Sequence, residues 1–236
     1  MVRKSWLLIA AVGIAAALTV TGAPVAVGQN KTVEPFNGRN LDGWIKREGR
    51  NTSQWVVGKA RMNPQERTAL LVEPVASGGE LINAKAESVD IYTAQKWGDV
   101  HIEVELMYPA GSNSGIYVCG EYEVQVLDSA RREVQRASDL GGLYRVAAPK
   151  VNAAKGPGEW QKFVIDFRAP RFEGERKVRN ARFDRVLLNG QVIHENVEMP
   201  MHTPTGVTQQ EHPTGPILLQ GDHGPVAYRN IKVTPR

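Results

Sequence analysis

The sequence predicts an all-β protein whose two antiparallel sheets pack as a sandwich or jelly roll. Apolar residues recur with period two along many short segments, helical periodicity is almost absent, and turns rich in Gly, Pro and Asn separate the segments. Hydrophobic residues make up 42% of the chain and charged residues 23%, which excludes a disordered or collagen-like protein. We expect a single domain over residues 29–236, a length that suits one large β sandwich.

Residues 1–28 have the features of a secretory signal peptide. Arg3 and Lys4 give a charged start, an apolar run extends to Val20, and small residues lead to a cleavage site after Gly28. A membrane anchor is the alternative, because the apolar run is nearly long enough to span a bilayer. With cleavage, the protein is expected in the periplasm or outside the cell, without a membrane partner.

Charge and cysteine content exclude several functions. The 29 lysines and arginines exceed the 25 aspartates and glutamates by four, and by only two once the leader is removed. This small surplus, without a basic helix, predicts no binding to nucleic acid. The single cysteine, Cys119, excludes a disulfide framework and a multi-cysteine metal site, and is interpreted as a small strand residue.

Alternation of side chains places several strands. In residues 100–108 the apolar side chains share one face, and the polar ones, including Glu103, share the other. Residues 121–126 and 163–167 alternate in the same way. The polar face of such a strand is either a solvated outer surface or the lining of a groove, and both interpretations stay open for Glu103.

Turn chemistry places other segments. Asn189-Gly190 suits the two positive-φ positions of a type I′ turn, so residues 185–194 are predicted to form a hairpin. The last strand is expected over residues 226–233, and the polar residues 128–142 are expected to form a loop over a sheet edge. The basic stretch 168–185 is interpreted as a solvated strand and loop, with a rim that attracts an anionic substrate as the alternative.

The first polar constellation lies on two predicted strands. Asn113 and Ser114 would start one strand, and Glu123 and Gln125 would share a face of the next. If apolar walls flank Glu123, its pKa should rise toward neutrality, as a proton-transfer residue requires. The alternative is an exposed strand carboxylate.

The spacing Glu123-x-Gln125-x-x-Asp128 invites comparison with retaining glycosidases. Laminarinase-type endoglucanases, which are jelly rolls, use Glu-x-Asp-x-x-Glu on one strand. Here Gln125 cannot ionise and Asp128 is one methylene shorter, whereas a retaining mechanism needs two carboxyl groups about 5–5.5 Å apart. The trio therefore argues against ordinary glycoside hydrolysis.

The second constellation is the tight turn that contains Gln220, Asp222 and His223, with glycines at 221 and 224. Asp222 could fix the tautomer of His223 for acid–base work. The alternative is a turn histidine bonded to the backbone.

Metal binding has little support in the spacing of residues. His202, His212 and His223 lie within 22 residues but match no short ligand motif. The residues that could instead supply oxygen ligands are Glu103, Glu123 and Asp128.

Aromatic residues and one arginine complete the candidates. Tyr144, after two glycines, is expected to reach a groove. Arg229 is placed on the same face as Ile231 and Val233, which favours a buried structural pairing over substrate contact. The tryptophans are expected to plug the core more often than to stack on sugars; they are Trp44, Trp55, Trp97 and Trp160.

Seven segments of the chain, taken in order, resemble one known family. They are Phe36-Asn37-Gly38 with Leu41-Asp42-Gly43-Trp44, Asn113-Ser114-Gly115-Ile116-Tyr117, Tyr122-Glu123-Val124-Gln125, Gly158-Glu159-Trp160, Leu188-Asn189-Gly190, Leu219-Gln220-Gly221-Asp222-His223-Gly224 and Tyr228-Arg229-Asn230-Ile231. They are similar to the 3-keto-disaccharide hydrolase family, also described as 3-keto-glucoside 1,2-lyases and 3-keto-2-hydroxy-glucal hydratases. The resemblance runs from about residue 34 to residue 234 and implies a concanavalin A-like jelly roll.

The resemblance implies an enzyme that cleaves 3-keto-glycosides. A ketone at C3 acidifies the hydrogen at C2, so a single base can remove it, the group on C1 leaves, and water adds to the resulting enone. This route needs a base, a leaving-group acid, and donors or a cation at the developing enolate. A divalent cation is therefore the cofactor that the implied chemistry could use, and no pair of facing carboxylates is required.

The resemblance implies that Glu123 and His223 are the catalytic base and acid, in either order. The residues expected to contact the substrate are Asn113, Gln125, Tyr144, Gln220, Arg229 and Glu103. The expected partners are an oligosaccharide or glycoside substrate and an upstream sugar 3-dehydrogenase that makes the ketone.

Two other functions stay open at this point. A non-catalytic carbohydrate-binding jelly-roll module would show exposed tryptophans on a groove that lacks a perturbed carboxylate or histidine. An ordinary glycoside hydrolase would bring Asp128 within retaining distance of Glu123.

Overall fold

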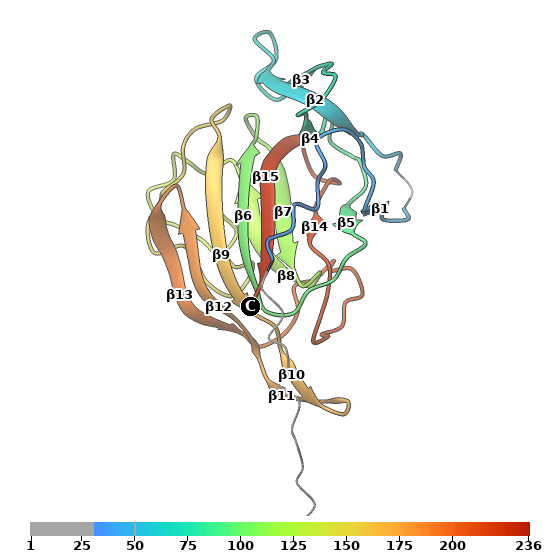
Figure 1. Cartoon of the computed structure of the whole chain (residues 1–236). Coiled ribbons are helices and arrows are strands. Elements are labelled where there is room, and N and C mark those ends of the chain that lie inside the picture. Colours follow the sequence, from blue (N-terminus) through green and yellow to red (C-terminus); the bar gives the residue numbers. More distant parts are fainter. Residues whose placement is uncertain (1–30, 50) are drawn as a thin grey trace, which may run out of the picture.

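Strands alone form the regular structure in the computed structural model, which describes residues 31–49 and 51–236. Two antiparallel sheets pack face to face (Figure 1), which confirms the predicted sandwich. The predicted leader, residues 1–28, lies outside the described residues. Within the described part of the chain, no helix is long and apolar enough to cross a membrane.

The larger sheet has eight strands in the order β13-β12-β9-β6-β15-β4-β2-β3. The C-terminal strand, β15, pairs with both β4 and β6 and so joins distant parts of the chain at the centre of the sheet. The strands are β2 (Trp55–Met62), β3 (Leu70–Glu73), β4 (Glu80–Asn83), β6 (Val100–Met107), β9 (Gln161–Arg168), β12 (Ala181–Leu188), β13 (Gln191–Met199) and β15 (Val226–Pro235).

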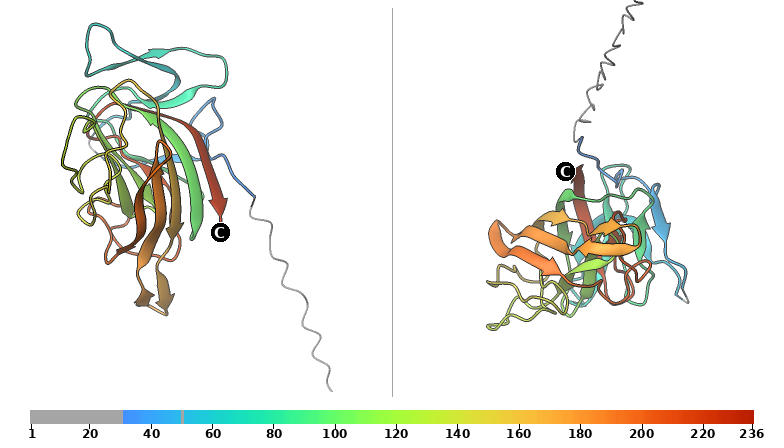
Figure 2. Two further views of the ribbon diagram at one scale, coloured as in Figure 1. Left: turned by 90° about the vertical axis from the view of Figure 1, so that its left-hand side faces the viewer. Right: turned by 90° about the horizontal axis from the view of Figure 1, so that it is seen from below.

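The smaller sheet has five strands in the order β1-β5-β14-β7-β8. They are β1 (Trp44–Lys46), β5 (Ile91–Thr93), β14 (Leu218–Leu219), β7 (Asn113–Val118) and β8 (Tyr122–Leu127). Because β14 lies between β5 and β7, the turn that follows β14 is brought beside the first residues of β7. A separate ribbon, β10 (Arg171–Glu173) with β11 (Arg176–Arg179), projects from one end of the molecule (Figures 1 and 2).

Alternation along the strands fills the core between the two sheets, as predicted. Along β6 the apolar side chains from Val100 to Leu106 are buried, while the polar ones between them are half-exposed. On β8, Tyr122 and Val124 join the core, but Glu123 on the opposite face is buried as well. Other segments of the chain must therefore cover the outer face of β8.

The predicted hairpin over residues 185–194 is confirmed. β12 and β13 pair up to Leu188 and Gln191, and the two turn residues, Asn189 and Gly190, have φ of 51° and 84°. The Asn189 side chain also bonds beyond the turn, because its Oδ1 accepts from the Lys162 amide at 2.9 Å. The last strand, predicted over residues 226–233, is β15.

The outer face of the large sheet is solvated and carries ion pairs. Glu103 lies 2.6 Å from Lys162 Nζ, and His101 lies 2.8 Å from Asp166. The expected substrate contact by Glu103 gains no support from this arrangement, because its side chain belongs to the solvated face and is neutralised by a lysine on the neighbouring strand.

Arg229 also lies on this outer face. The sequence-based placement of Arg229 on the same face as Ile231 and Val233 is therefore wrong. The register of β15 against β6 shifts between Arg229 and Lys232, and Asn230 has φ of 52°. This bulge breaks the period-two alternation, so Ile231 is buried while Arg229 bonds Glu105 Oε2 at 2.8 Å. The Arg229 guanidinium also lies 3.9 Å from the centre of the Trp160 ring.

The basic stretch 168–185 forms the end of β9, the β10–β11 ribbon and most of β12. Its bases are largely neutralised by acids, which supports the solvated interpretation rather than an anion-attracting rim. The pairs are Arg168 and Arg182 with Asp184, Arg171 with Asp99, Arg176 with Glu173, Lys177 with Glu211, and Arg185 with Asp166.

Trp44, Trp55 and Trp97 are buried core residues, as expected. They therefore offer no exposed platform for a sugar ring. Cys119 lies in the turn between β7 and β8, with φ of 53°, rather than in a strand. Burial raises its pKa to about 12, so the thiol is unreactive at neutral pH.

Candidate active site

A pocket of about 170 Å³ lies on the face of the small sheet that points away from the core. Two strands, two loops and the turn after β14 supply its walls. The lining residues are Asn113 and Tyr117 from β7, Glu123 and Gln125 from β8, Tyr144, Arg145, Pro204 and Thr205 from loops, and Gln220 and His223 from the turn. Six of the eight residues proposed from the sequence thus meet in one pocket, and only Glu103 and Arg229 do not.

Glu123 is the buried acid of this pocket. Its exposed fraction is 3%, and burial raises its pKa to about 7. A hydrogen bond with Tyr117 and the nearby His223 act in the opposite direction, while Asp222 and Asp90 raise the pKa further. Both protonation states of Glu123 are therefore accessible near neutral pH, which suits a residue that accepts a proton from carbon.

The strand pairing explains how Glu123 reaches the pocket. Tyr117 of β7 lies opposite Glu123, and Gly115 lies opposite Gln125. A side chain at position 115 would collide with the carboxylate, because a Cβ there would lie 2.6 Å from Glu123 Oε1. The glycine of the Asn-Ser-Gly-Ile-Tyr segment therefore leaves room for the Glu123 carboxylate in its observed position.

Two amide oxygens of the pocket-lining residues are buried without a hydrogen-bond partner among the described residues. They are Asn113 Oδ1 and Gln220 Oε1, and Gln220 is 7% exposed. The Gln220 backbone is fixed, because its carbonyl accepts from Ser114 Oγ at 2.7 Å. Since an unpaired buried oxygen is costly, a ligand with hydroxyl groups is expected to satisfy both.

His223 is exposed at the mouth of the pocket and is oriented by its neighbour. Asp222 Oδ1 lies 2.5 Å from His223 Nδ1, as proposed from the sequence, and Gln220 Nε2 lies 3.4 Å from the same nitrogen. A carboxylate at Nδ1 fixes the ring tautomer and directs Nε2 toward a ligand. His223 can therefore exchange a proton through Nε2, which accepts when the ring is neutral and donates when the ring is protonated.

Two loops pair with the β7–β8 hairpin and carry the residues that the sequence did not reveal. The Tyr144 amide donates to the Glu123 carbonyl at 3.2 Å, which holds Tyr144 and the following Arg145 at the pocket. On the other side, the Thr203 amide donates to the Glu121 carbonyl at 2.8 Å. Arg145 and Thr205 both have positive φ, 63° and 70°, and no sequence pattern marks them.

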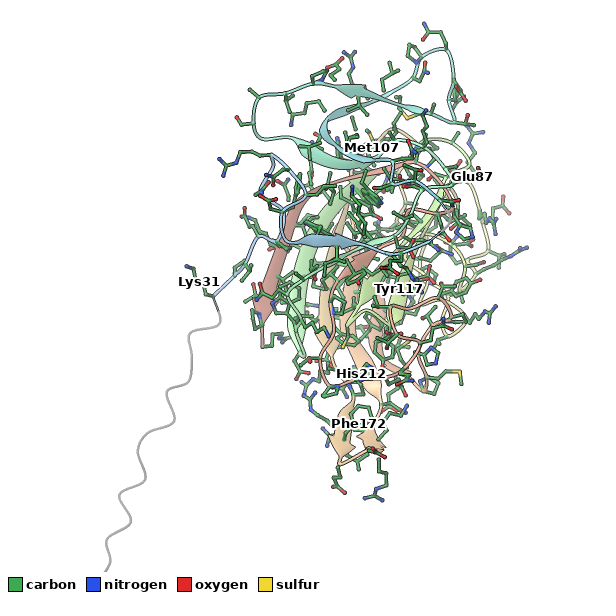
Figure 3. The ribbon with its side chains drawn as sticks, turned by 90° about the vertical axis from the view of Figure 1, so that its right-hand side faces the viewer. Lys31, Glu87, Met107, Tyr117, Phe172 and His212 are labelled. Atoms are coloured by element: carbon green, nitrogen blue, oxygen red, sulfur yellow. The ribbon has the colours of Figure 1, made fainter. Side chains whose placement is uncertain are left out.

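Tyr117 is a further site residue, and strand parity could have identified it. It shares a face of β7 with Asn113, and its hydroxyl lies 3.0 Å from Thr205 Oγ1. Burial raises its pKa, so the phenol stays protonated and can donate. Tyr117 is buried, and Figure 3 shows it between Met107 and His212 along the length of the molecule, with His212 and Phe172 toward the β10–β11 end.

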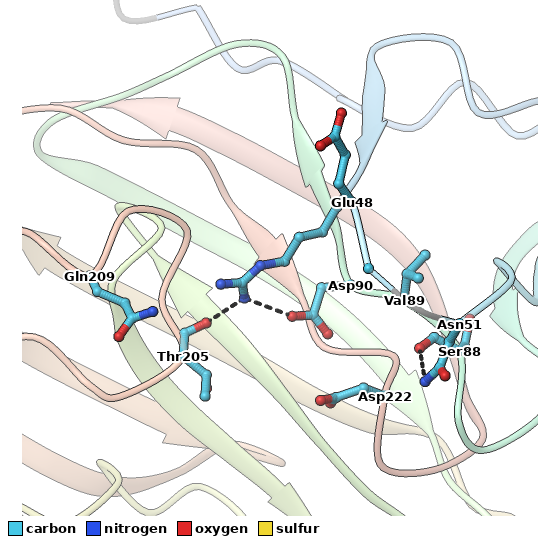
Figure 4. A pocket seen from close by; sticks show the side chains of 10 residues that line it. Glu48, Asn51, Ser88, Val89, Asp90, Thr205, Gln209 and Asp222 are labelled. Carbon is cyan, nitrogen blue, oxygen red and sulfur yellow. Dashed lines mark hydrogen bonds and ion pairs between the residues drawn. The ribbon is translucent and has the colours of Figure 1, made fainter.

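A second hollow of about 300 Å³, which we call the outer pocket, adjoins the first and shares Thr205 with it (Figure 4). Its floor contains Asp90, which is buried and whose pKa is raised by that burial. Arg47 lies 3.1 Å from Asp90 Oδ2 and donates to the carbonyl of Thr205 at 2.7 Å. Neither Arg47 nor Asp90 was identified from the sequence.

Asp128 does not approach Glu123 as a glycosidase partner. Its Oδ2 accepts from the Gly111 amide at 3.0 Å, and the residue lines a different hollow with Arg67 and Arg131. Among the described residues that line the 170 Å³ pocket, Glu123 is the one carboxylate.

The ligand sets considered for a metal are not assembled. Within residues 31–49 and 51–236, no three His, Cys, Asp or Glu side chains are grouped so that they could hold a metal ion. His202, for instance, interacts through Nδ1 with the Thr203 carbonyl, and His212 through Nε2 with Thr208.

Comparison with known proteins gives a family and two structural relatives. The family described as 3-keto-alpha-glucoside-1,2-lyase-like domain matches residues 31–234. A candidate glycosyl hydrolase from Parabacteroides distasonis ATCC 8503 is 25% identical, with a TM-score of 0.66 over 87% of this chain and 84% of that one. A second from the same organism is 16% identical, with a TM-score of 0.58 over 87% and 94% of the two chains. A search of curated proteins found no match.

Proposed function

We propose that this chain, which belongs to the 3-keto-alpha-glucoside-1,2-lyase-like family, is an enzyme that cleaves 3-keto-glycosides by elimination and hydration. The observation that carries the proposal is the single buried carboxyl of Glu123, whose pKa is about 7, in a pocket that also holds an aspartate-oriented histidine. A C2–H made acidic by a neighbouring ketone needs one base of this kind.

In the proposed first step, the Glu123 carboxylate takes the proton from C2, and the C–H electron pair forms an enolate with the C3 ketone. The enolate then re-forms the ketone as a C1–C2 double bond develops and the C1–O bond breaks. His223 donates its proton to the departing oxygen, so the leaving group is released as a neutral alcohol.

Hydration completes the reaction. A water adds to C1 of the enone, its proton passes to His223, and protonated Glu123 returns a proton to C2. The products are a 3-keto sugar and the free alcohol, and both residues regain their starting protonation states. No electrons are exchanged with a cofactor, because the ketone is already present in the substrate.

The remaining pocket residues are suited to binding and charge stabilisation. Arg145 can donate to the oxygen on which the enolate charge develops. The unpaired oxygens of Asn113 and Gln220 can accept from sugar hydroxyls, and Tyr144 offers a ring face beside Arg145.

The geometry favours this reaction over the two other functions. A retaining glycosidase needs a second carboxylate close to the first. Asp128, the partner that the strand spacing offers, lies in a different hollow, and Asp90 and Asp222 line the outer pocket and not the inner one. A binding module needs no proton-transfer residue, yet the pocket contains a carboxyl with a strongly raised pKa.

The test compares an aryl 3-keto-glucoside with the unoxidised aryl glucoside, using the purified chain with and without EDTA. Release from the keto substrate alone, slowed by deuterium at C2, would support the proposal, and loss of activity with EDTA would show that a divalent cation takes part. Release from the plain glucoside would instead indicate an ordinary glycosidase. If neither is cleaved at high enzyme concentration, the binding module is favoured.

We also propose that the protein is exported and acts after a sugar 3-dehydrogenase, because the chain begins with a leader-like segment and the reaction consumes a ketone. Cell fractionation followed by N-terminal sequencing checks the first part, with Gln29 as the expected first residue. Retention of Met1 in a membrane fraction would overturn it.

A further inference from the structure

We propose that the outer pocket binds the leaving group and selects neutral, hydroxyl-rich leaving groups over anionic ones. The inference rests on the proposed function, since it assigns the second half of that substrate. The outer pocket is lined by Arg47, Glu48, Gly49, Asn51, Ser88, Val89, Asp90, Thr205, Gln209 and Asp222.

The two pockets meet at the residues that would act on the scissile bond. Thr205 lines both, Asp222 lines the outer pocket, and His223, which is bonded to Asp222, lines the inner one. A bond that runs from one pocket to the other would therefore lie near Thr205 and the Asp222–His223 pair. In the proposed mechanism, the proton donor must lie between the sugar and its leaving group, and the junction of the two pockets is such a position.

The inner pocket is too small to hold both parts of a disaccharide. Its volume of about 170 Å³ suits one sugar ring better than two. Pockets for drug-sized ligands usually have about 300–1,000 Å³, a range that is reached only when the 300 Å³ outer pocket is included. The second sugar of a disaccharide is therefore expected to lie in the outer pocket or in solvent.

The charges of the outer pocket disfavour an anionic leaving group. Its lining contains the carboxylates of Glu48, Asp90 and Asp222 and one cation, Arg47. The Arg47 guanidinium is already engaged within the protein, because it pairs with Asp90 and also donates to the carbonyls of Thr205 and Gly206. A uronate or phosphate would face a surplus of negative charge without a free cation to bind it.

The outer pocket also contains polar side chains that can form hydrogen bonds with the hydroxyl groups of a ligand. Asn51 and Gln209 are exposed amides on opposite walls (Figure 4), and each offers a donor and an acceptor. A second sugar ring presents hydroxyl groups on several sides, so it can bond both walls, whereas a small alkyl group can reach neither.

The experiment measures kcat/KM for three substrates: methyl 3-keto-glucoside, a 3-keto-disaccharide with a neutral leaving sugar, and the same disaccharide with a uronic acid as leaving sugar. We expect the neutral disaccharide to be preferred over the methyl glycoside by at least tenfold, with most of the difference in KM. The uronate should be several-fold poorer than the neutral disaccharide, and high salt should reduce this gap.

Variants at Gln209 test whether the outer pocket causes these preferences. Gln209 has φ of 55°, so Gln209→Gly removes the side chain without backbone strain and should lower the ratio of disaccharide to methyl-glycoside activity. Gln209→Lys supplies the missing cation and should raise the uronate-to-neutral ratio by about threefold, as for a unit charge about 6 Å away in water. Glu103→Gln, on the far sheet, is the matched control and should change neither ratio.

The outcomes separate this inference from the proposed function. If methyl 3-keto-glucoside is cleaved but the disaccharide gains nothing, or if the Gln209 variants leave both ratios unchanged, the leaving group lies in solvent and the inference is wrong. If the wild-type chain cleaves none of the three substrates, the proposed function fails and the inference fails with it.

Discussion

Glu123 shows how one side chain acquires a catalytic pKa from its surroundings. Burial raises the pKa to about 7, so the carboxylate needed for proton abstraction becomes more abundant as the pH rises. We expect kcat/KM for a 3-keto-glucoside to rise with pH through a midpoint near 7 as Glu123 ionises, and the proton donor of the proposed mechanism gives the profile a descending limb at higher pH. Glu123→Gln should lower kcat by roughly 10²- to 10⁴-fold, the usual contribution of a general base.

A pH series with both proteins checks this prediction, and Glu103→Gln serves as the control for loss of a carboxylate outside the site. A flat profile between about pH 5 and 9, or Glu123→Gln activity within tenfold of wild type, would contradict the role of Glu123 as the base.

The same pKa predicts that Glu123 weakens the fold at alkaline pH. The folded-state pKa of about 7 lies above the ordinary value of 4.5. The stability that protonated Glu123 contributes is therefore fully present below about pH 4.5 and is lost as the pH rises through about 7. The loss is about 3 kcal/mol in the free energy of unfolding.

Glu123→Gln cannot ionise, so it should be more stable than wild type at about pH 9 and differ little from it at about pH 4. Urea unfolding at the two pH values measures both differences. If the variant gains the same amount at each pH, its effect is one of packing and not of ionisation.

The sequence could predict those site residues whose positions depend only on their neighbours along the chain. Glu123 and Gln125 share a strand face by period-two alternation, and Asp222 adjoins His223 along the chain. Arg145 could not be found, because its place depends on a loop that pairs with β8 and on a positive φ. Neither property leaves a residue pattern.

At the scale of elements, the segment Thr203–Gly206 depends on Arg47, which lies far away in the sequence. Its guanidinium bonds Asp90, the Thr205 carbonyl at 2.7 Å and the Gly206 carbonyl at 3.1 Å. Thr205 is β-branched and has φ of 70°, a conformation that is strained and persists only when its surroundings hold it. Arg47 is thus a positioning residue for the wall between the two pockets.

We expect Arg47→Met to cost about 2 kcal/mol in the free energy of unfolding, because buried Asp90 would lose its cation and two carbonyls their donor. Activity should fall through kcat, since Thr205 would no longer hold the Tyr117 hydroxyl beside Glu123. Arg47→Lys keeps the positive charge but loses the planar guanidinium that donates to several acceptors at once. Compared with Arg47→Met, it should therefore recover part of the lost stability and a smaller part of the lost kcat. Urea midpoints and steady-state kinetics measure the two effects. Equal restoration of both would indicate a purely structural role.

The elements themselves were largely predictable, and the exception has a clear cause. Alternation over residues 100–108 and the Asn189-Gly190 turn each place a strand or hairpin without tertiary information. The alternation failed at Arg229, because the bulge at Asn230 shifts the phase of β15. A bulge of this kind is set by pairing with β6, which the local sequence does not show.

At the scale of the whole molecule, the outward-facing sides of the two sheets differ in burial and in charge pairing. The small sheet carries a buried polar face, covered by loops that pair with β8, and both pockets lie there. The large sheet turns a charged face to solvent and has its polar groups neutralised in pairs. Single-strand alternation is the same on both sheets, so the sequence alone could not assign Glu103 and Glu123 to different environments.

This division predicts that Arg229 matters for stability and not for catalysis. Its guanidinium pairs with Glu105 at 2.8 Å and stacks on the Trp160 ring at 3.9 Å, with buried Glu80 at 3.7 Å. Arg229→Met should therefore lower the free energy of unfolding by about 1–2 kcal/mol, while kcat/KM for a 3-keto-glucoside stays within about twofold of wild type because the site lies on the other sheet.

Asn113→Ala is the complementary change. It should leave the urea midpoint close to wild type, since Asn113 Oδ1 has no partner among the described residues to lose, and it should raise KM. Measuring both quantities for both variants gives opposite patterns if the two faces are independent. A tenfold loss of kcat/KM in Arg229→Met would mean that the outer face of the large sheet is coupled to the pocket, and the separation between a structural sheet and a functional sheet would have to be abandoned.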